Sequence, residues 1–153
     1  MTAPRYEHIQ RAPLCVIVYA VAVAMLAAGL YFRDISPLLW LYPPISAMLL
    51  VLAASFHFLA ITDRGDCLKV SFGPIPLIRR SIPYENIARV NADRTWLVEG
   101  WGVHLSLRGG WIWNLWGRDC VLMTFRDGTP FRLGTDDVEN LVAFLNSKVA
   151  SEQ

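Results

Sequence analysis

Two residues of one predicted strand, His104 and Ser106, are of the types that hydrolases use for nucleophilic catalysis. Residues two apart in a strand point to the same side, so the imidazole and the hydroxyl could face one substrate. A serine nucleophile also needs a tight glycine turn and backbone N–H groups that form an oxyanion hole, and neither is evident around these residues. The sequence also has no phosphate-binding loop of the Gly-Lys-Ser type. We therefore expect a protein that is not an enzyme.

Acidic residues cluster at Asp136, Asp137 and Glu139, where they could be taken for a metal site. They fall in the expected first turn of a helix, where carboxylates favour the positive end of the helix dipole. The three cysteines are far apart in the sequence, and none forms the Cys-x-x-Cys pair of a zinc site. We expect no metal and no cofactor, and thiols that stay reduced.

Three tryptophans, Trp111, Trp113 and Trp116, are concentrated between residues 111 and 116. Trp111 and Trp113 are two apart and therefore share one face of an extended strand. The tryptophans could pack in the core of a small domain, because each buried aromatic ring stabilises it considerably. They could instead dock on a membrane, where tryptophan favours the headgroup level, or bind a protein partner as interface hot spots.

Arginines near the tryptophans extend the candidate surface. Arg79 and Arg80 end a short predicted strand, where they could attract anionic lipid by ~1 kcal/mol each or simply discourage edge pairing. Arg118 follows a glycine in a turn, where it could bind an anion or form part of a turn stabilised by Asp119. The candidate surface for a partner or for lipid consists of Arg79, Arg80, Trp111, Trp113, Trp116 and Arg118.

The chain that carries these residues begins with two apolar runs, residues 14–32 and 38–61, which contain no Asp, Glu, Lys or Arg. A hydrocarbon core of ~30 Å needs about 20 helical residues, so each run predicts a transmembrane helix. The short segment 33–37 would join them in a hairpin. The first run is longer than the apolar core of a signal peptide, which has about 7–15 residues.

Basic residues flank the two runs mainly on one side. Arg5 and Arg11 precede the first run, Arg64 and Lys69 follow the second, and the turn between the runs has one arginine and one aspartate. The positive-inside rule therefore predicts a multi-pass protein of the cytoplasmic (inner) membrane with both termini in the cytoplasm. Residues 1–13 would be a cytoplasmic tail. The expected aromatic belt at the opposite interface consists of Tyr31, Phe32, Trp40 and Tyr42.

Residues 62–153 carry eleven basic and eleven acidic residues, so their net charge is zero. This balance argues against nucleic-acid binding, which usually requires a basic face. Alternating apolar and polar residues predict about seven short strands, with hairpin turns at Gly109-Gly110 and Asp127-Gly128. Apolar residues at helical spacing after Asp136 then predict one amphipathic helix.

Several motifs accompany this order of elements: IPYENI at 82–87, GWGV at 100–103, and GWIWNLWGRDCVLMTFRDGTPFRLGTDDVENLVAFL at 110–145. Together they resemble the bacterial pleckstrin-homology-like (PH-like) domains that occur beside one or two membrane helices. The resemblance implies an α+β fold in which residues 62–149 form a mostly antiparallel seven-stranded barrel or sandwich. One C-terminal α-helix would cap this domain, and residues 150–153 would be a tail.

The resemblance implies a binding platform rather than an enzyme. Eukaryotic PH domains often bind inositol phospholipids through basic residues around the first hairpin, but here that turn is the short, uncharged GPIP at 73–76. The expected function is therefore a non-catalytic, membrane-anchored scaffold or adaptor that binds a protein partner or itself at the cytoplasmic face. The alternative is a lipid-headgroup platform that uses the basic edge and the tryptophan strand.

Overall fold

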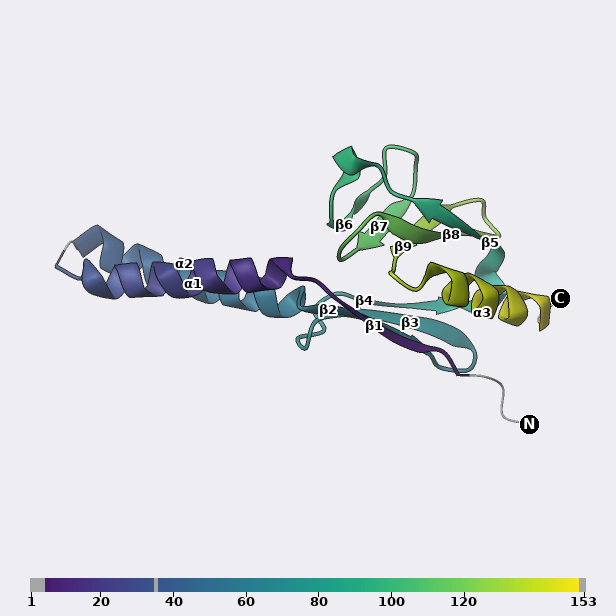
Figure 1. Ribbon diagram of the computed structural model, residues 1–153, viewed down its shortest axis with the longest axis horizontal. Helices are drawn as coiled ribbons and strands as arrows, with labels where there is room; N and C mark the ends of the chain where they lie inside the picture. The colour runs from purple at the N-terminus through teal and green to yellow at the C-terminus, as the bar shows by residue number, and fades with distance from the viewer. Residues whose placement is uncertain (1–4, 35, 152–153) are drawn as a thin grey trace.

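The computed structural model describes residues 5–34 and 36–151. This part of the chain has an α+β fold with three α-helices and nine strands in two mostly antiparallel sheets. Two long helices project side by side from one end of the molecule, and the sheets with the third helix form the other end (Figure 1). The α+β class predicted from the sequence is confirmed.

The two long helices are α1 (Leu14–Tyr31) and α2 (Ser36–Ser55), and they pack against each other. The Ser46 hydroxyl of α2 donates a 2.7 Å hydrogen bond to the Ala22 carbonyl of α1. Nearer the turn, Gly29 lets α1 approach Tyr42 closely, since a Cβ at this position would collide with that side chain. Small residues at such contacts are typical of helix pairs that approach each other closely.

Within the described residues, α1 is long and apolar enough to cross a membrane, with 18 residues and a mean hydropathy of 2.4. The apolar part of α2, Trp40–Ser55, is shorter. α2 continues through two internal prolines, Pro43 and Pro44. By length and composition alone, the structure thus supports one candidate membrane span.

The second apolar run is a composite of helix and strand, whereas the sequence predicted a helix as far as Ile61. α2 ends at Ser55, and strand β2 (Phe58–Asp63) begins after a break of two residues. Leu59 and Ile61 are buried on one face of β2. A continuous apolar run does not distinguish a helix from a buried strand, and here the neighbouring strands decided the conformation.

The first sheet has the order β1-β2-β3-β4, with β1 (Glu7–Arg11), β3 (Cys67–Phe72) and β4 (Arg79–Pro83) all antiparallel to their neighbours. The sequence assigned residues 1–13 to a tail and did not predict β1. This strand has little apolar alternation of its own, and it forms because the edge of β2 offers unpaired backbone groups.

The second sheet is less regular, with the order β5-β8-β9-β7-β6. β9 pairs in parallel with β7 and antiparallel with β8, so this sheet is not a simple meander. The strands are β5 (Ile87–Arg94), β6 (Gly102–Leu105), β7 (Trp111–Asn114), β8 (Asp119–Phe125) and β9 (Pro130–Gly134).

One hydrophobic core lies between the two sheets and helix α3 (Val138–Ser151). The Thr135 hydroxyl accepts a 3.1 Å hydrogen bond from the Asp137 backbone N–H just before α3, and Leu141 and Leu145 are buried on its inner face. The predicted amphipathic helix is confirmed. The described chain has nine strands rather than the predicted seven because β1 and β2 lie in segments assigned to the tail and the helix.

Candidate interaction surfaces

The six residues that the sequence grouped into one surface do not lie together. Trp113 belongs to the core, since only 8% of it is exposed. Its ring lies 5.9 Å from that of Phe131 and 5.8 Å from that of Phe72, measured between centroids. The prediction that Trp113 contributes to a surface is therefore wrong. β7 is flanked by β9 and β6, and its inner face is covered by the first sheet.

Arg79 and Arg80 lie on β4, at the edge of the first sheet. Arg79 is exposed, whereas the Arg80 guanidinium lies over the Phe131 and Phe125 rings at 4.7 and 5.5 Å from their centroids. Such cation–π contacts hold the guanidinium against the end of the core. Arg80 therefore packs against the aromatic rings of the core, whereas the Arg79 side chain is exposed to solvent.

Trp111 begins β7 and is 44% exposed, although it shares a strand with Trp113. It lies opposite Leu105 of β6 in the antiparallel register, and Leu105 and Leu107 are also exposed. β6 is an edge strand of the second sheet among the described residues. We refer to Leu105, Leu107 and Trp111 as the β6 edge.

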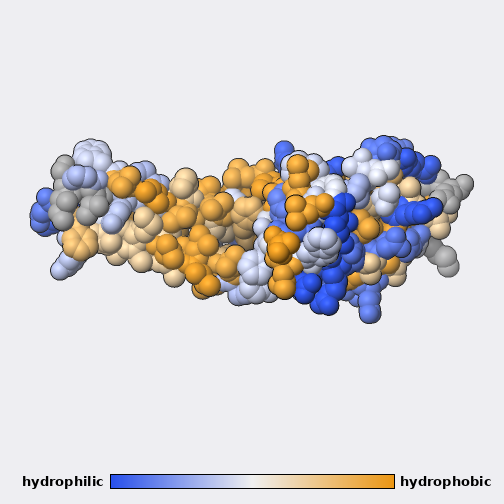
Figure 2. Space-filling model, turned by 90° about the horizontal axis from the view of Figure 1, so that it is seen from above, coloured by the Kyte–Doolittle hydropathy of each residue, from blue (hydrophilic) through white to orange (hydrophobic). Residues whose placement is uncertain are grey.

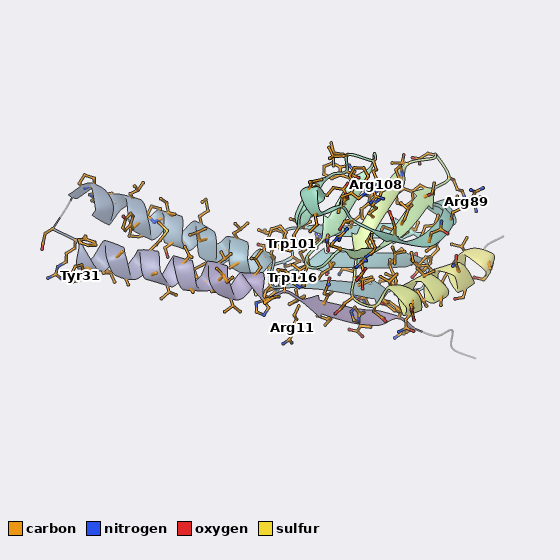
Figure 3. All side chains as sticks on the ribbon, turned by 45° about the horizontal axis from the view of Figure 1, so that its top comes forward. Arg11, Tyr31, Arg89, Trp101, Arg108 and Trp116 are labelled. Atoms are coloured by element: carbon orange, nitrogen blue, oxygen red, sulfur yellow. The ribbon has the colours of Figure 1, made fainter. Side chains whose placement is uncertain are left out.

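Trp116 belongs to a different cluster, at the end of the domain from which the long helices project (Figure 3), and Arg118 lies beside Trp101 of the same cluster. Trp116 is stacked on Trp101, with ring centroids 4.5 Å apart and an angle of 21° between the planes. Arg118 donates a 3.2 Å hydrogen bond through Nε to the Thr95 carbonyl. A hollow of roughly 150 Å³ lies between Trp96, Trp101 and Arg118.

The loop that carries these tryptophans includes the 3-10 turn η2 (Leu97–Glu99), and Glu99 holds it in place. The buried Glu99 carboxylate accepts a 2.8 Å hydrogen bond from the Trp96 backbone N–H and another from the Ser106 hydroxyl. Burial raises the pKa of Glu99, but these hydrogen bonds and the Arg108 charge outweigh it and hold the pKa below its ordinary value.

Two arginines connect this loop to the second sheet. Arg132 donates a 2.9 Å hydrogen bond to Asp93, and Arg108 lies 3.3 Å from the same carboxylate. Burial raises the pKa of Asp93, but the hydrogen bonds from Arg132, the Arg94 backbone and Arg108 together lower it below its ordinary value. This ion network was not expected from the sequence, where its only signal is a glutamate within the apolar, Trp-rich segment 96–103.

His104 and Ser106, the residues considered for nucleophilic catalysis, have separate surroundings. Ser106 donates its hydroxyl to Glu99 and accepts a hydrogen bond from the Arg108 backbone N–H. Nε2 of His104 is buried and has no hydrogen-bond partner among the described residues. Ser106 thus belongs to the ion network. The absence of enzymatic activity stays a prediction.

A thiol and an imidazole meet where the long helices join the first sheet. Sγ of Cys15 lies 3.5 Å from Nδ1 of His57, and Cys15 lines an apolar cavity of roughly 210 Å³ together with Trp101 and Phe56. All three cysteines are free. Across the described ranges, no group of three or more His, Cys, Asp or Glu side chains could hold a metal ion.

No known family model matches the chain, and no curated protein matches its sequence. The resemblance to PH-like domains therefore stays a prediction.

Proposed function

We propose that this protein is a non-catalytic, membrane-anchored scaffold or adaptor. α1 and α2 form a transmembrane hairpin, and the two sheets with α3 form a PH-like domain at the cytoplasmic face of the inner membrane. The domain presents one face to a protein partner or to a second copy of the chain. The observation that carries this proposal is the direct connection between the two long helices and two paired strands.

Each long helix is separated from its strand by only two residues. Ala12 and Pro13 lie between β1 and α1, and Phe56 and His57 lie between α2 and β2. Because β1 and β2 are paired, the helices and the first sheet form one continuous antiparallel element (Figure 1). The Phe56 ring packs on Phe72 of β3 with centroids 5.3 Å apart, which further stiffens the junction. A rigid junction fixes the orientation of the domain, as a scaffold requires.

The dimensions and surface of the hairpin support a double span. At 1.5 Å per residue, α1 is about 27 Å long and α2 about 30 Å, of which the apolar part, Trp40–Ser55, accounts for about 24 Å, against the ~30 Å of a hydrocarbon core. Apolar side chains such as Val16 and Met48 are exposed along the pair, although water would disfavour them. Tyr31 and Trp40 are exposed near the turn, the position expected for an interfacial aromatic belt.

The β6 edge supports partner binding. An edge strand offers unpaired backbone N–H and C=O groups, and an added strand from a partner would pair with them. Natural proteins usually protect such edges with charges or prolines, whereas here Leu105 and Leu107 are 65% and 76% exposed. This exposed apolar edge is therefore suited to β-strand addition, by another protein or by a second copy.

Site-specific photo-cross-linking in the native membrane tests this function. A photoreactive amino acid at Leu105 or Leu107 should give a discrete adduct, and Trp111→Ala should weaken it. Arg89, exposed at the far end of the domain in Figure 3, is the matched control position. An adduct of twice the chain mass would indicate self-association. The proposal fails if the β6 edge gives no adduct, or no more than Arg89.

A further inference from the structure

We propose that the domain does not hang free below the membrane but inserts an apolar rim into the anionic headgroup layer of the bilayer that its own helices cross. This inference rests on the proposed membrane anchor. The rim is formed by two loops at the helix end of the domain, and we call it the headgroup rim. Its members are Ile75, Leu77, Trp96, Leu97, Val98 and Trp101, all exposed.

The loop between β3 and β4 lies directly against the end of α2. A Cβ at Gly73 would collide with the carbonyl oxygens of Ala54 and Ser55, so this loop must pass closely over the last turn of the helix. Leu77, two thirds exposed, follows in the same loop. An apolar side chain is therefore presented next to the point where α2 meets the first sheet.

The η2 loop reaches the same end from the second sheet. Trp101 lines the 210 Å³ cavity together with Leu14 of α1 and Leu52 of α2, which places this loop beside the helices. At its tip, Leu97 and Val98 are each 78% exposed. The two loops thus flank the exit of the helix pair from different sheets.

The η2 loop is held in this exposed conformation by the buried ion network. Glu99 is fixed by the Trp96 N–H and by Ser106, and Arg108 lies 5.3 Å from the Trp96 ring centroid. A loop that served only to connect strands could turn Leu97 and Val98 inward. Instead, the buried charges hold the η2 loop in a conformation that leaves Leu97 and Val98 exposed on the domain surface.

The position of the rim and the arginines beside it favour a bilayer over a protein partner. In Figure 2 the apolar surface of the helices continues onto the adjoining end of the domain, and most of the remaining domain surface in that view is hydrophilic. Trp, Leu and Val are the residues by which peripheral segments enter the boundary between headgroups and acyl chains. Arg118 lines the hollow with Trp96 and Trp101, and Arg11 lies at the same end of the domain, so both could meet lipid phosphates.

Spin labels in the full-length protein test the rim. The three native cysteines are replaced by alanine, and single cysteines are introduced as Leu97→Cys or Val98→Cys and labelled with a nitroxide. The protein is placed in nanodiscs of phosphatidylcholine with phosphatidylglycerol, and collisions with oxygen and with a water-soluble nickel chelate are compared. Leu26→Cys, on an exposed position of α1, reports the anchor, and Arg89→Cys reports the aqueous side.

We expect the labels at 97, 98 and 26 to be more accessible to oxygen than to the nickel chelate, and the label at 89 to show the reverse. If 97 and 98 behave like 89 while 26 favours oxygen, the rim lies in water, and this inference fails with the anchor intact. If 26 also behaves like 89, the proposed anchor itself fails. If 97 and 98 are shielded from both reagents, protein covers the rim and the inference is overturned.

Discussion

Trp111 and Trp113 share one strand and one face, yet their surroundings differ. Trp113 contacts Phe72 and Phe131 in the core, whereas 44% of Trp111 is exposed. Trp113 is thus a core residue, and Trp111 is a surface residue of the same strand.

Trp113→Ala should lower the free energy of unfolding by ~3–5 kcal/mol, because it removes a buried ring and leaves a cavity. Trp111→Ala is the matched control and should cost much less, because Trp111 is partly in solvent. Chemical denaturation of the detergent-solubilised protein, followed by far-UV circular dichroism, measures both. Equal losses for the two variants would contradict the assignment of Trp113 alone to the core.

Acid should weaken the ion network around η2. Asp93 and Glu99 have pKa values held below their ordinary 3.8 and 4.5, so folding is favoured when both are ionised. The stability that the two ionised carboxylates add to the folded state is fully present above these ordinary pKa values. It is lost as the pH falls through the lower pKa values of the folded state. As the pH is lowered past about 4.5, the melting temperature should therefore decrease, and it should decrease less steeply in the double variant Asp93→Asn, Glu99→Gln. The same acid dependence in both proteins would show that other groups control it.

At the scale of elements, the β6–β7 hairpin depends on the backbone at its turn. Gly110 has a φ of +77°, and a Cβ there would collide with the carbonyl of Pro130, where β9 begins. Gly117 has a similar φ of +79° but open space around it. The turn signal Gly109-Gly110 was visible in the sequence, but the close approach of β9 was not.

Gly110→Ala should therefore destabilise the protein more than Gly117→Ala. Both variants force alanine into the left-handed region, which costs ~1–2 kcal/mol, and only Gly110→Ala must also displace Pro130. Thermal unfolding of the two variants under identical conditions measures the difference. Similar melting temperatures would mean that β9 moves away from the hairpin without cost.

At the scale of the whole molecule, the proposed topology places the turn between α1 and α2 on the opposite side of the membrane from the sheets. In a cysteine-free background, Asp34→Cys should react with a membrane-impermeant maleimide in intact cells. Arg64→Cys, also at an exposed position but beside the first sheet, should react only after the cytoplasmic membrane is permeabilised. Labelling of both residues in intact cells would contradict the predicted orientation.

Elements with local signals follow from the amino-acid pattern of one segment alone. The apolar composition of residues 14–31 produces α1, alternation and turn residues produce β5 and β8, and helical spacing after Asp136 produces α3. Each of these patterns is complete within one segment, so no other part of the chain was needed to recognise it.

Other features depend on distant neighbours and arise only when the chain is folded. β1 exists because β2 offers it an edge, and residues 58–61 are a strand rather than helix because β1 and β3 pair with them. The Glu99 network and the gathering of two loops beside the helices join segments that are far apart in the sequence. Pairing and burial across such distances leave no periodicity in any one segment. They separate the predicted surface into a core residue (Trp113), residues at two sheet edges (Arg79, Arg80 and Trp111) and a cluster near the helices (Trp116 and Arg118).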